Sequence, residues 1–251
     1  KIAELYKKVY RFKKAKEYLK DVAENKFAPK NTVAKAFLTL GEIYEMENDF
    51  KQAFENYNKA AEYAQNKEDE RILLSEIYYR IGTLYDDGQN TEKALEYYQK
   101  SIDCALDINE DENFGFLSGS YANMGLIYSE LWNESGDAEY RSKTIFSLQK
   151  ALEIDTKHNN ANGIYTICKH LALVFRDTEP EKSLEYLHLA LTASKEMADN
   201  FKMAISYLEI GDYYYNSRNN ISALRNYLEA RKVLGTSISE ENKESITVRI
   251  N

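Results

Sequence analysis

The sequence predicts an all-α fold in which antiparallel helix pairs stack on one another along the chain. Two observations lead to this prediction. Helix breakers are scarce, with 10 glycines and 2 prolines in 251 residues, well below their average usage. In addition, one set of aromatic and small residues at helical spacing recurs about every forty positions, which is typical of stacked-helix arrays. No run of about 18 apolar residues occurs, so we expect no helix that spans a membrane.

The recurring set has two parts. In the first part an aromatic residue is followed after three positions by Leu, Ile or Met with Gly, and three positions later by Tyr. Its copies are Phe37-Leu40-Gly41-Tyr44, Tyr78-Ile81-Gly82-Tyr85, Tyr121-Met124-Gly125-Tyr128 and Tyr207-Ile210-Gly211-Tyr214. The second part is Ala53-Tyr57-Ala60, Ala94-Tyr98-Ser101, Thr144-Leu148-Ala151 and Ala223-Tyr227-Ala230. A degenerate copy is Cys168-Leu171-Ala172-Phe175 with Ser183-Leu187-Ala190.

These spacings of three, four and seven place the members of each part on one face of a helix. Small residues such as Gly41 and Ala60 allow two helix backbones to approach closely, and large rings such as Tyr57 and Tyr98 fill the space beside them. Each unit is therefore a pair of antiparallel helices. One pair cannot bury its apolar face alone, so the pairs must stack.

This pattern resembles the signature of the tetratricopeptide repeat family. The resemblance implies a right-handed α-solenoid over residues 1–235. It divides this stretch into a truncated first repeat at 1–26, where Tyr6, Ala15, Leu19 and Val22 match the signature, and five copies. The copies lie near 34–67, 75–108, 118–155, 165–195 and 204–235. We expect residues 236–251 to form a capping helix or the start of a removed segment.

The repeats are longer than the 34-residue period of the family. Successive glycine positions are separated by 41, 43, 47 and 39 residues. In this they resemble kinesin light chains and bacterial peptide-sensor regulators. An insertion at 131–143 accounts for the longest interval, and the second helix of that copy is expected to begin near Asp137. Trp132 in this insertion is either a contact for a partner or a cover over a gap between repeats.

No catalytic or metal-binding site is recognisable. Cys104 and Cys168 have no CxxC neighbour, and the histidines at positions 158, 170 and 188 are too dispersed to supply the converging ligands of a zinc site. Cys168 occupies an aromatic position of the signature, where burial is expected. No phosphate-binding loop or nucleophile elbow occurs. The sequence therefore predicts a protein that is not an enzyme and that uses no cofactor and no metal.

The charge balance limits the partners. The 33 Lys and Arg stand against 41 Asp and Glu, which gives a pI near 5.2. Direct nucleic-acid binding is disfavoured, because neutralising phosphates needs a basic surface.

Two further features concern helix starts. Thr178-Glu179-Pro180-Glu181 has the spacing of a capping box, just before the helix that contains Ser183. The chain begins at Lys1 in the middle of a helical pattern and looks truncated. Targeting is therefore unreadable, and we expect a cytoplasmic protein without membrane insertion.

In the family that the pattern resembles, the first helix of each pair lines a concave groove that binds peptides. Counting from each glycine position gives the candidate groove residues Lys35, Glu42, Glu45, Tyr79, Arg80, Asp86, Asn123, Lys169, Arg176, Asp212 and Tyr215. Over the wider set of inward-facing positions, four side chains are basic and nine are acidic, namely Glu42, Glu45, Glu76, Asp86, Asp87, Glu130, Asp177, Glu209 and Asp212. This excess favours a ligand with a basic segment, although an acidic protein has acidic grooves by default. The carboxylate clamp of chaperone-binding members is absent, since Leu38 and Glu42 occupy its first positions.

The predicted function is a non-enzymatic scaffold that binds a protein or peptide in this groove. The alternative is a sensor module of a larger bacterial signalling protein, such as a peptide-responsive regulator, a kinase or a cyclase. Exposed end repeats could also stack between two molecules, so a homodimer is compatible with the pattern.

Overall fold

The computed structural model describes residues 2–64, 70–106 and 110–235. These parts contain twelve α-helices and no strand. The helices are α1 (Ile2–Lys8), α2 (Phe12–Glu24), α3 (Lys30–Met46), α4 (Phe50–Tyr63), α5 (Arg71–Asp87), α6 (Thr91–Leu106), α7 (Glu110–Ser135), α8 (Ala138–Lys157), α9 (Ala161–Phe175), α10 (Pro180–Glu196), α11 (Asn200–Asn216) and α12 (Asn220–Leu234). Residues 236–251, for which a capping helix is predicted, lie outside the described residues.

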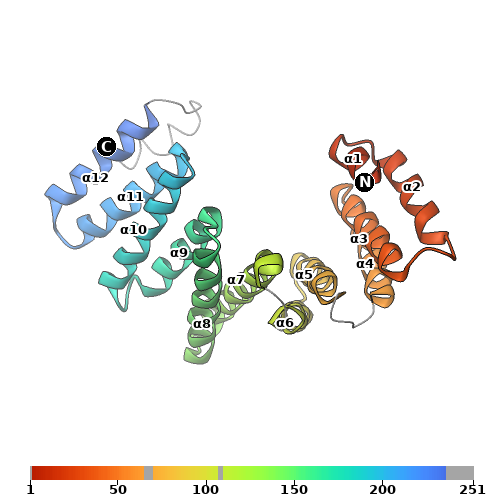
Figure 1. Cartoon of the computed structure of the whole chain (residues 1–251). Coiled ribbons are helices and arrows are strands. Elements are labelled where there is room, and N and C mark those ends of the chain that lie inside the picture. Colours follow the sequence, from red (N-terminus) through yellow and green to blue (C-terminus); the bar gives the residue numbers. More distant parts are fainter. Residues whose placement is uncertain (1, 65–69, 107–109, 236–251) are drawn as a thin grey trace. The chain divides into compact units, whose positions relative to one another are not determined.

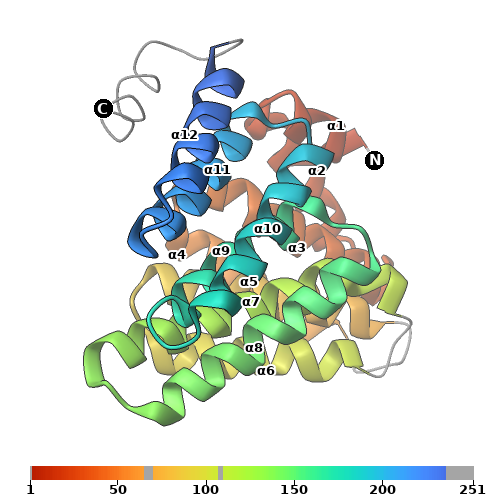
Figure 2. The same ribbon diagram turned by 90° about the vertical axis from the view of Figure 1, so that its left-hand side faces the viewer.

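The chain divides into two units, residues 1–127 and 128–251. In the first unit each helix from α1 to α6 packs on the next, and in the second unit the same holds from α8 to α12. The partners of a pair, such as α3 with α4 or α11 with α12, lie side by side (Figures 1 and 2). This arrangement confirms the predicted all-α solenoid of helix pairs. The repeat boundaries stay a prediction.

The predicted small-residue notch is present inside three helix pairs. A Cβ atom added at Gly82 would lie 2.8 Å from the ring of Tyr98, which no real Cβ atom tolerates without displacement of its neighbour. Both Gly82 and Tyr98 are buried. The same close contact recurs at Gly41–Tyr57, Gly82–Tyr98 and Gly211–Tyr227. The signature glycines thus let a tyrosine ring of the second helix lie against the backbone of the first.

A second recurring contact joins the two helices of a pair through stacked aromatic rings. It is found at Tyr6–Tyr18, Tyr85–Tyr97, Tyr128–Tyr140 and Phe175–Tyr186. The ring centroids of Tyr85 and Tyr97 are 5.4 Å apart, a favourable stacking distance. The Lys93 ammonium lies 5.1 Å from the centroid of the Tyr85 ring, and the Lys182 ammonium lies 4.0 Å from that of Phe175. Lysine side chains therefore cover these stacks through cation–π contacts.

The turns between helices follow one scheme at five places. A non-glycine residue with positive φ is followed by an Asp or Asn whose side chain caps the next helix. The pairs are Asn48–Asp49, Gln89–Asn90, Asn159–Asn160, Ala198–Asp199 and Arg218–Asn219. At the first of them the Asp49 carboxylate accepts the N–H of Gln52 at 3.1 Å. This cap satisfies an amide that would otherwise lack a partner.

One predicted cap is wrong. The capping-box spacing assigned the N-cap of α10 to Thr178, but the N-cap is Glu179 and its side chain makes no capping hydrogen bond. The Thr178 hydroxyl instead accepts a hydrogen bond of 2.7 Å from the Arg141 guanidinium. The reason is Pro180, which fixes φ at the first helical position and starts the helix without an N-terminal hydrogen bond.

The insertion behaves as the sequence predicts. Helix α8 begins at Ala138, and the carboxylate of its N-cap Asp137 accepts the N–H of Glu139 at 2.8 Å. The early start adds two turns and leaves Thr144 and Leu148 buried, at 0% and 1% exposure. Trp132 is half-buried, and the Arg141 guanidinium lies 5.7 Å from its ring centroid.

Candidate functional site

Two hollows open on the first helices of the pairs, one within each unit. The hollow of the first unit has a volume of about 840 Å³ and is lined by α1, α2, α3 and α5. The hollow of the second unit has a volume of about 790 Å³ and is lined by α9, α10 and α11. Both are large enough for a few side chains of a peptide, so each is a candidate binding site.

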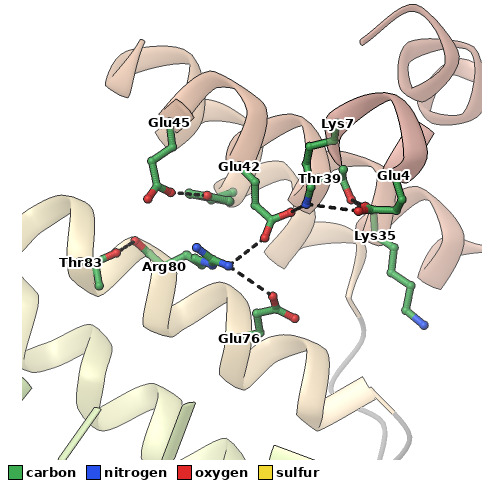
Figure 3. A network of polar contacts seen from close by, with 10 residues as sticks. Glu4, Lys7, Lys35, Thr39, Glu42, Glu45, Glu76, Arg80 and Thr83 are labelled. Atoms are coloured by element: carbon green, nitrogen blue, oxygen red, sulfur yellow. Dashed lines mark hydrogen bonds and ion pairs between the residues drawn. The ribbon is translucent and has the colours of Figure 1, made fainter. Parts of the chain in front are cut away.

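The charged groups of the first hollow are mostly paired with each other, as Figure 3 shows. Glu42 of α3 accepts a hydrogen bond of 2.5 Å from Lys7 of α1 and one of 2.8 Å from Arg80 of α5. The Lys7 ammonium also lies 3.3 Å from Glu4. Glu42 therefore links three successive first helices. The predicted groove acid has a structural role here, and its charge is already compensated.

The pKa shifts of Lys7 and Arg80 agree with this structural role of Glu42. Burial alone would lower the pKa of Lys7, but its hydrogen bond to Glu42 and the attraction of that carboxylate raise it above the ordinary value. Burial likewise lowers the pKa of Arg80, but the combined attraction of Glu42 and the neighbouring Tyr57, Glu45 and Glu76 raises it above the ordinary value. Both cations thus stay charged in a partly desolvated setting, where an ion pair is stronger than in water.

Glu76 and Lys35 are the charges of the first hollow that the network leaves least compensated. The Glu76 carboxylate is 3.9 Å from the Arg80 guanidinium, beyond hydrogen-bonding distance. Burial, followed by the negative charge of Glu42, raises its pKa. The Lys35 side chain is exposed and points away from the other charges (Figure 3). An incoming ligand would meet these two side chains first.

Several predicted groove residues accept hydrogen bonds from tyrosines of the second helices, of which Tyr57 and Tyr98 are buried and Tyr227 is half-buried. Tyr57 donates a hydrogen bond of 2.6 Å to Glu45, Tyr98 one of 3.4 Å to Asp86, and Tyr227 one of 2.8 Å to Asp212. Burial is the main cause that raises the pKa of Tyr57 and of Tyr98, so both phenols remain donors at neutral pH. These carboxylates therefore hold the two helices of a pair together.

Two other candidates lie at the junction between α5–α6 and α7. The Asn123 amide donates a hydrogen bond of 3.0 Å to the Tyr98 hydroxyl. The Tyr79 ring lies 5.9 Å from the Tyr98 ring and 5.7 Å from the Phe116 ring, measured between centroids. Asn123 and Tyr79 thus pack successive pairs together, and neither lines one of the two hollows.

The second hollow leaves more of its side chains open. Leu173 is 56% exposed and Tyr215 is 63% exposed. The Arg176 side chain is also 63% exposed, and its Nε lies 3.3 Å from the neighbouring Asp177 carboxylate. Lys169, in contrast, forms an ion pair with Glu209 of α11. This hollow therefore offers an apolar side chain, a phenol and a guanidinium to a ligand.

The structure thus brings the predicted residues together in two groups. Lys35 and Glu42 line the first hollow, and Lys169, Arg176, Asp212 and Tyr215 line the second. Sequence reasoning did not include Lys7 and Glu4 among the groove residues, because α1 belongs to the truncated copy, which lacks the glycine from which the others were counted. The spacing of Tyr6 in that copy could have located them.

Neither cysteine is set up as a nucleophile. Cys168 is fully buried, and burial raises its pKa to about 12. Burial also raises the pKa of Cys104. In the part of the chain that the structure describes, no three His, Cys, Asp or Glu side chains converge on a point where a metal ion could bind. No described helix has the length and apolar character needed to cross a membrane.

Comparison with protein families gives one match. Residues 32–107 match the profile of the tetratricopeptide repeat. Residues 32–107 are therefore identified as tetratricopeptide repeats. The matched segment covers the two pairs α3–α4 and α5–α6. Each remaining pair repeats one of the two contacts: α11–α12 has the Gly–Tyr contact, and α1–α2, α7–α8 and α9–α10 have a stacked ring pair. No curated protein matches the sequence.

Solved structures extend the likeness in fold over nearly the whole chain. BtubC (BKLC) from P. vanneervenii is 16% identical, with 90% of each chain covered and a TM-score of 0.69. PH0952 from Pyrococcus horikoshii, a signal transduction ATPase with a tetratricopeptide repeat sensor, is 20% identical over 93% of this chain and 33% of its own, with a TM-score of 0.62. YrrB, a TPR protein with an unusual peptide-binding site, is 18% identical over 86% and 92%, with a TM-score of 0.54. At these identities the likeness establishes the fold.

Proposed function

We propose that this tetratricopeptide-repeat protein is a non-enzymatic module that binds a peptide or a peptide-like segment of a partner protein. The hollow of α9, α10 and α11 is the proposed binding site. Stacked-helix arrays of this family are typically binding scaffolds, and YrrB, which has the same fold, is described as a peptide-binding protein.

The observation that supports this site is the exposure of Leu173 and Tyr215 inside a hollow. Exposed apolar side chains gathered in a concavity are typical of ligand sites, with a few polar groups that fix orientation. Lys169 and Glu209 neutralise each other across the wall, and the packed helices hold both side chains in place before a ligand arrives. This preorganisation lowers the entropic cost of binding.

The proposed ligand combines an apolar residue with a basic residue. Asp212 lines the hollow and is hydrogen-bonded to a phenol and not to a cation. Of the ionisable side chains that line the hollow, three are acidic and two are basic. A lysine or arginine of the ligand would therefore gain favourable electrostatic energy near Asp212, while its apolar neighbour contacts Leu173 and Tyr215.

Selection from a random peptide library, followed by affinity measurement on the selected peptides, tests the proposal. Leu173→Ser combined with Tyr215→Ala should weaken binding about ten-fold or more, since it removes most of the apolar contact. Leu224→Ser is the matched control, because Leu224 on α12 is 58% exposed but lines neither hollow. Equal losses in both variants, or selected peptides without a basic residue, would contradict the proposed site or the proposed charge.

A second candidate function is a sensor module within a larger signalling protein. The similarity to PH0952 favours it, because this chain corresponds to 33% of that protein, whose description includes a tetratricopeptide repeat sensor. The full reading frame distinguishes the two: a sensor should be joined to a DNA-binding, kinase, cyclase or nucleotide-hydrolysing domain whose activity changes when a peptide binds. If the reading frame encodes no such domain, the scaffold function remains the proposal.

A further inference from the structure

The first helix pair has a charge opposite to that of the whole chain. Residues 2–30 contain nine Lys and Arg against four Asp and Glu, whereas the whole chain has a net charge of −8. Such an asymmetry points to an anionic partner for the basic part. The hollows described above do not account for it, because Lys7 is the one cation of this segment among their lining residues.

Most of these cations are exposed. They are Lys8, Arg11, Lys13, Lys14, Lys20, Lys26 and Lys30. Lys14 lies over the Tyr6 ring, and the other six side chains make no ion pair or hydrogen bond with any described residue. The exposed acids among them are Glu17, Asp21 and Glu24. Lys7 and Lys16, in contrast, pair with Glu42 and Glu47 of α3, so the fold uses two cations and leaves seven at the surface.

An exposed aromatic ring stands in the middle of this basic segment. Phe27, in the turn between α2 and α3, is 97% exposed. Its N–H donates a hydrogen bond of 2.9 Å to the Asn25 side chain, and Pro29 caps α3. An Asx turn followed by proline is a stiff arrangement, so the ring is held in water. Lys26 and Lys30 flank it, and Lys20 precedes it on the last turns of α2.

We propose that the basic turn formed by Lys26, Phe27 and Lys30, together with Lys20 on the preceding turns of α2, docks on an anionic lipid surface. Lys13 is not included, because the face of α2 that it shares with Lys20 also carries Glu17 and Glu24. Lysines near a membrane surface are attracted to anionic headgroups, and an aromatic ring among them can enter the acyl boundary. Six of the seven exposed cations are lysines, which suits headgroups better than a protein interface, because interfaces are enriched in arginine and depleted in lysine.

This docking is peripheral and separate from the proposed peptide site. It leaves the hollow of α9, α10 and α11 untouched, so the two proposals fail independently. Because the attraction is electrostatic, it should weaken steeply as salt increases.

Vesicle flotation with the full chain tests the proposal. The protein should float with an equal mixture of phosphatidylcholine and phosphatidylglycerol, and not with phosphatidylcholine alone. Lys26→Glu with Lys30→Glu should lower the partition coefficient about ten-fold or more, and Phe27→Ala should lower it several-fold without changing the melting temperature. The matched control is Phe50→Ala with Lys51→Glu, which removes a half-exposed phenylalanine and an exposed lysine at the start of α4.

Three results would overturn the inference. The first is a wild type that does not float with the anionic vesicles at low ionic strength. The second is a control variant that loses as much binding as the Lys26 and Lys30 variant. The third is a wild type that binds neither vesicle but binds a Glu-rich peptide or an oligonucleotide through Lys26, Phe27 and Lys30, which would assign the surface to another class of anion.

Discussion

Glu42 in the first unit and Leu173 in the second occupy the same position of the repeat, directly after the residue at the glycine position, yet their surroundings differ. The Glu42 side chain is 16% exposed and bonds to cations from the helices on either side. Leu173 is 56% exposed and lines an open hollow. A groove position is therefore available to a ligand only if the neighbouring pairs do not supply a partner for it.

The two units nevertheless build their pairs in the same way. Gly82 and Gly211 each face a tyrosine ring of the second helix, and stacked rings join the helices in both units. The difference between the units thus lies on the groove face, while the interior of each pair follows one plan. The following predictions test this separation.

The largest expected difference concerns the two thiols, one in each unit. Burial raises the pKa of Cys168 to about 12 from its reference of 9.0, so its thiolate fraction at neutral pH should fall about a thousand-fold. Cys104, whose side chain is half-buried, should react first with Ellman's reagent. Stopped-flow absorbance on Cys104→Ser and Cys168→Ser separates the two rates. A fast Cys168 would show that the second unit opens more readily than its packing indicates.

Removing the central carboxylate of the first hollow should cost the most stability. Glu42→Ala leaves Lys7 and Arg80 partly buried without their shared anion, and we expect a loss of about 2 kcal/mol. Urea unfolding followed by circular dichroism measures it. Leu173→Ala at the equivalent position should have a much smaller effect, because that side chain is mostly exposed. A similar loss of stability in Glu42→Ala and Leu173→Ala would contradict the proposed difference between the two hollows.

The close contact between a signature glycine and a tyrosine ring should be equally sensitive to an added methyl group in both units. Gly82→Ala and Gly211→Ala place a Cβ atom against the packed rings of Tyr98 and Tyr227. We expect each to destabilise by about 1–2 kcal/mol, which is the overpacking cost reduced by the better helix propensity of alanine. Gly115→Ala in α7 is the control: an added Cβ meets nothing within 4 Å, so a gain of up to about 1 kcal/mol is expected. Thermal unfolding of the three variants distinguishes these outcomes.

The smallest effect is the pH dependence of Glu76. Its pKa in the folded state is raised by burial and by Glu42, so the folded state binds a proton more readily than the unfolded state. Stability is therefore lost as pH rises through this window. Glu76→Gln should be more stable than wild type at neutral pH, and the gain should shrink as pH falls toward the ordinary glutamate value. A gain independent of pH between those limits would assign the effect to packing instead.

Much of the fold could be predicted from the sequence because it depends on contacts close in the chain. The Gly82–Tyr98 contact lies within one helix pair, and the start of α8 follows from counting turns after the insertion. The stacked rings at Tyr85 and Tyr97 also lie within one pair, but no part of the recognised signature contains Tyr97. The N-cap of α10 was mispredicted because proline decides that helix start.

The candidate site was less predictable. The sequence placed Glu42, Arg176 and Tyr215 on the groove face by counting from small residues. It could not show that Lys7, 35 residues earlier, and Arg80, 38 residues later, would both reach the Glu42 carboxylate. Nor could it show that buried tyrosines would bond to Glu45 and Asp86. Such pairings depend on where long side chains from separate helices end.

By itself, the sequence determined that the chain forms helix pairs and which residues lie inside each pair, because helical periodicity and side-chain size are local properties. Only the tertiary structure decided which groove charges are already paired and which side chains remain open, because ion pairs and hollows form between helices whose spacing and register are set by packing. Glu42 and Leu173 illustrate both parts: their position follows from the repeat, and their role follows from their neighbours.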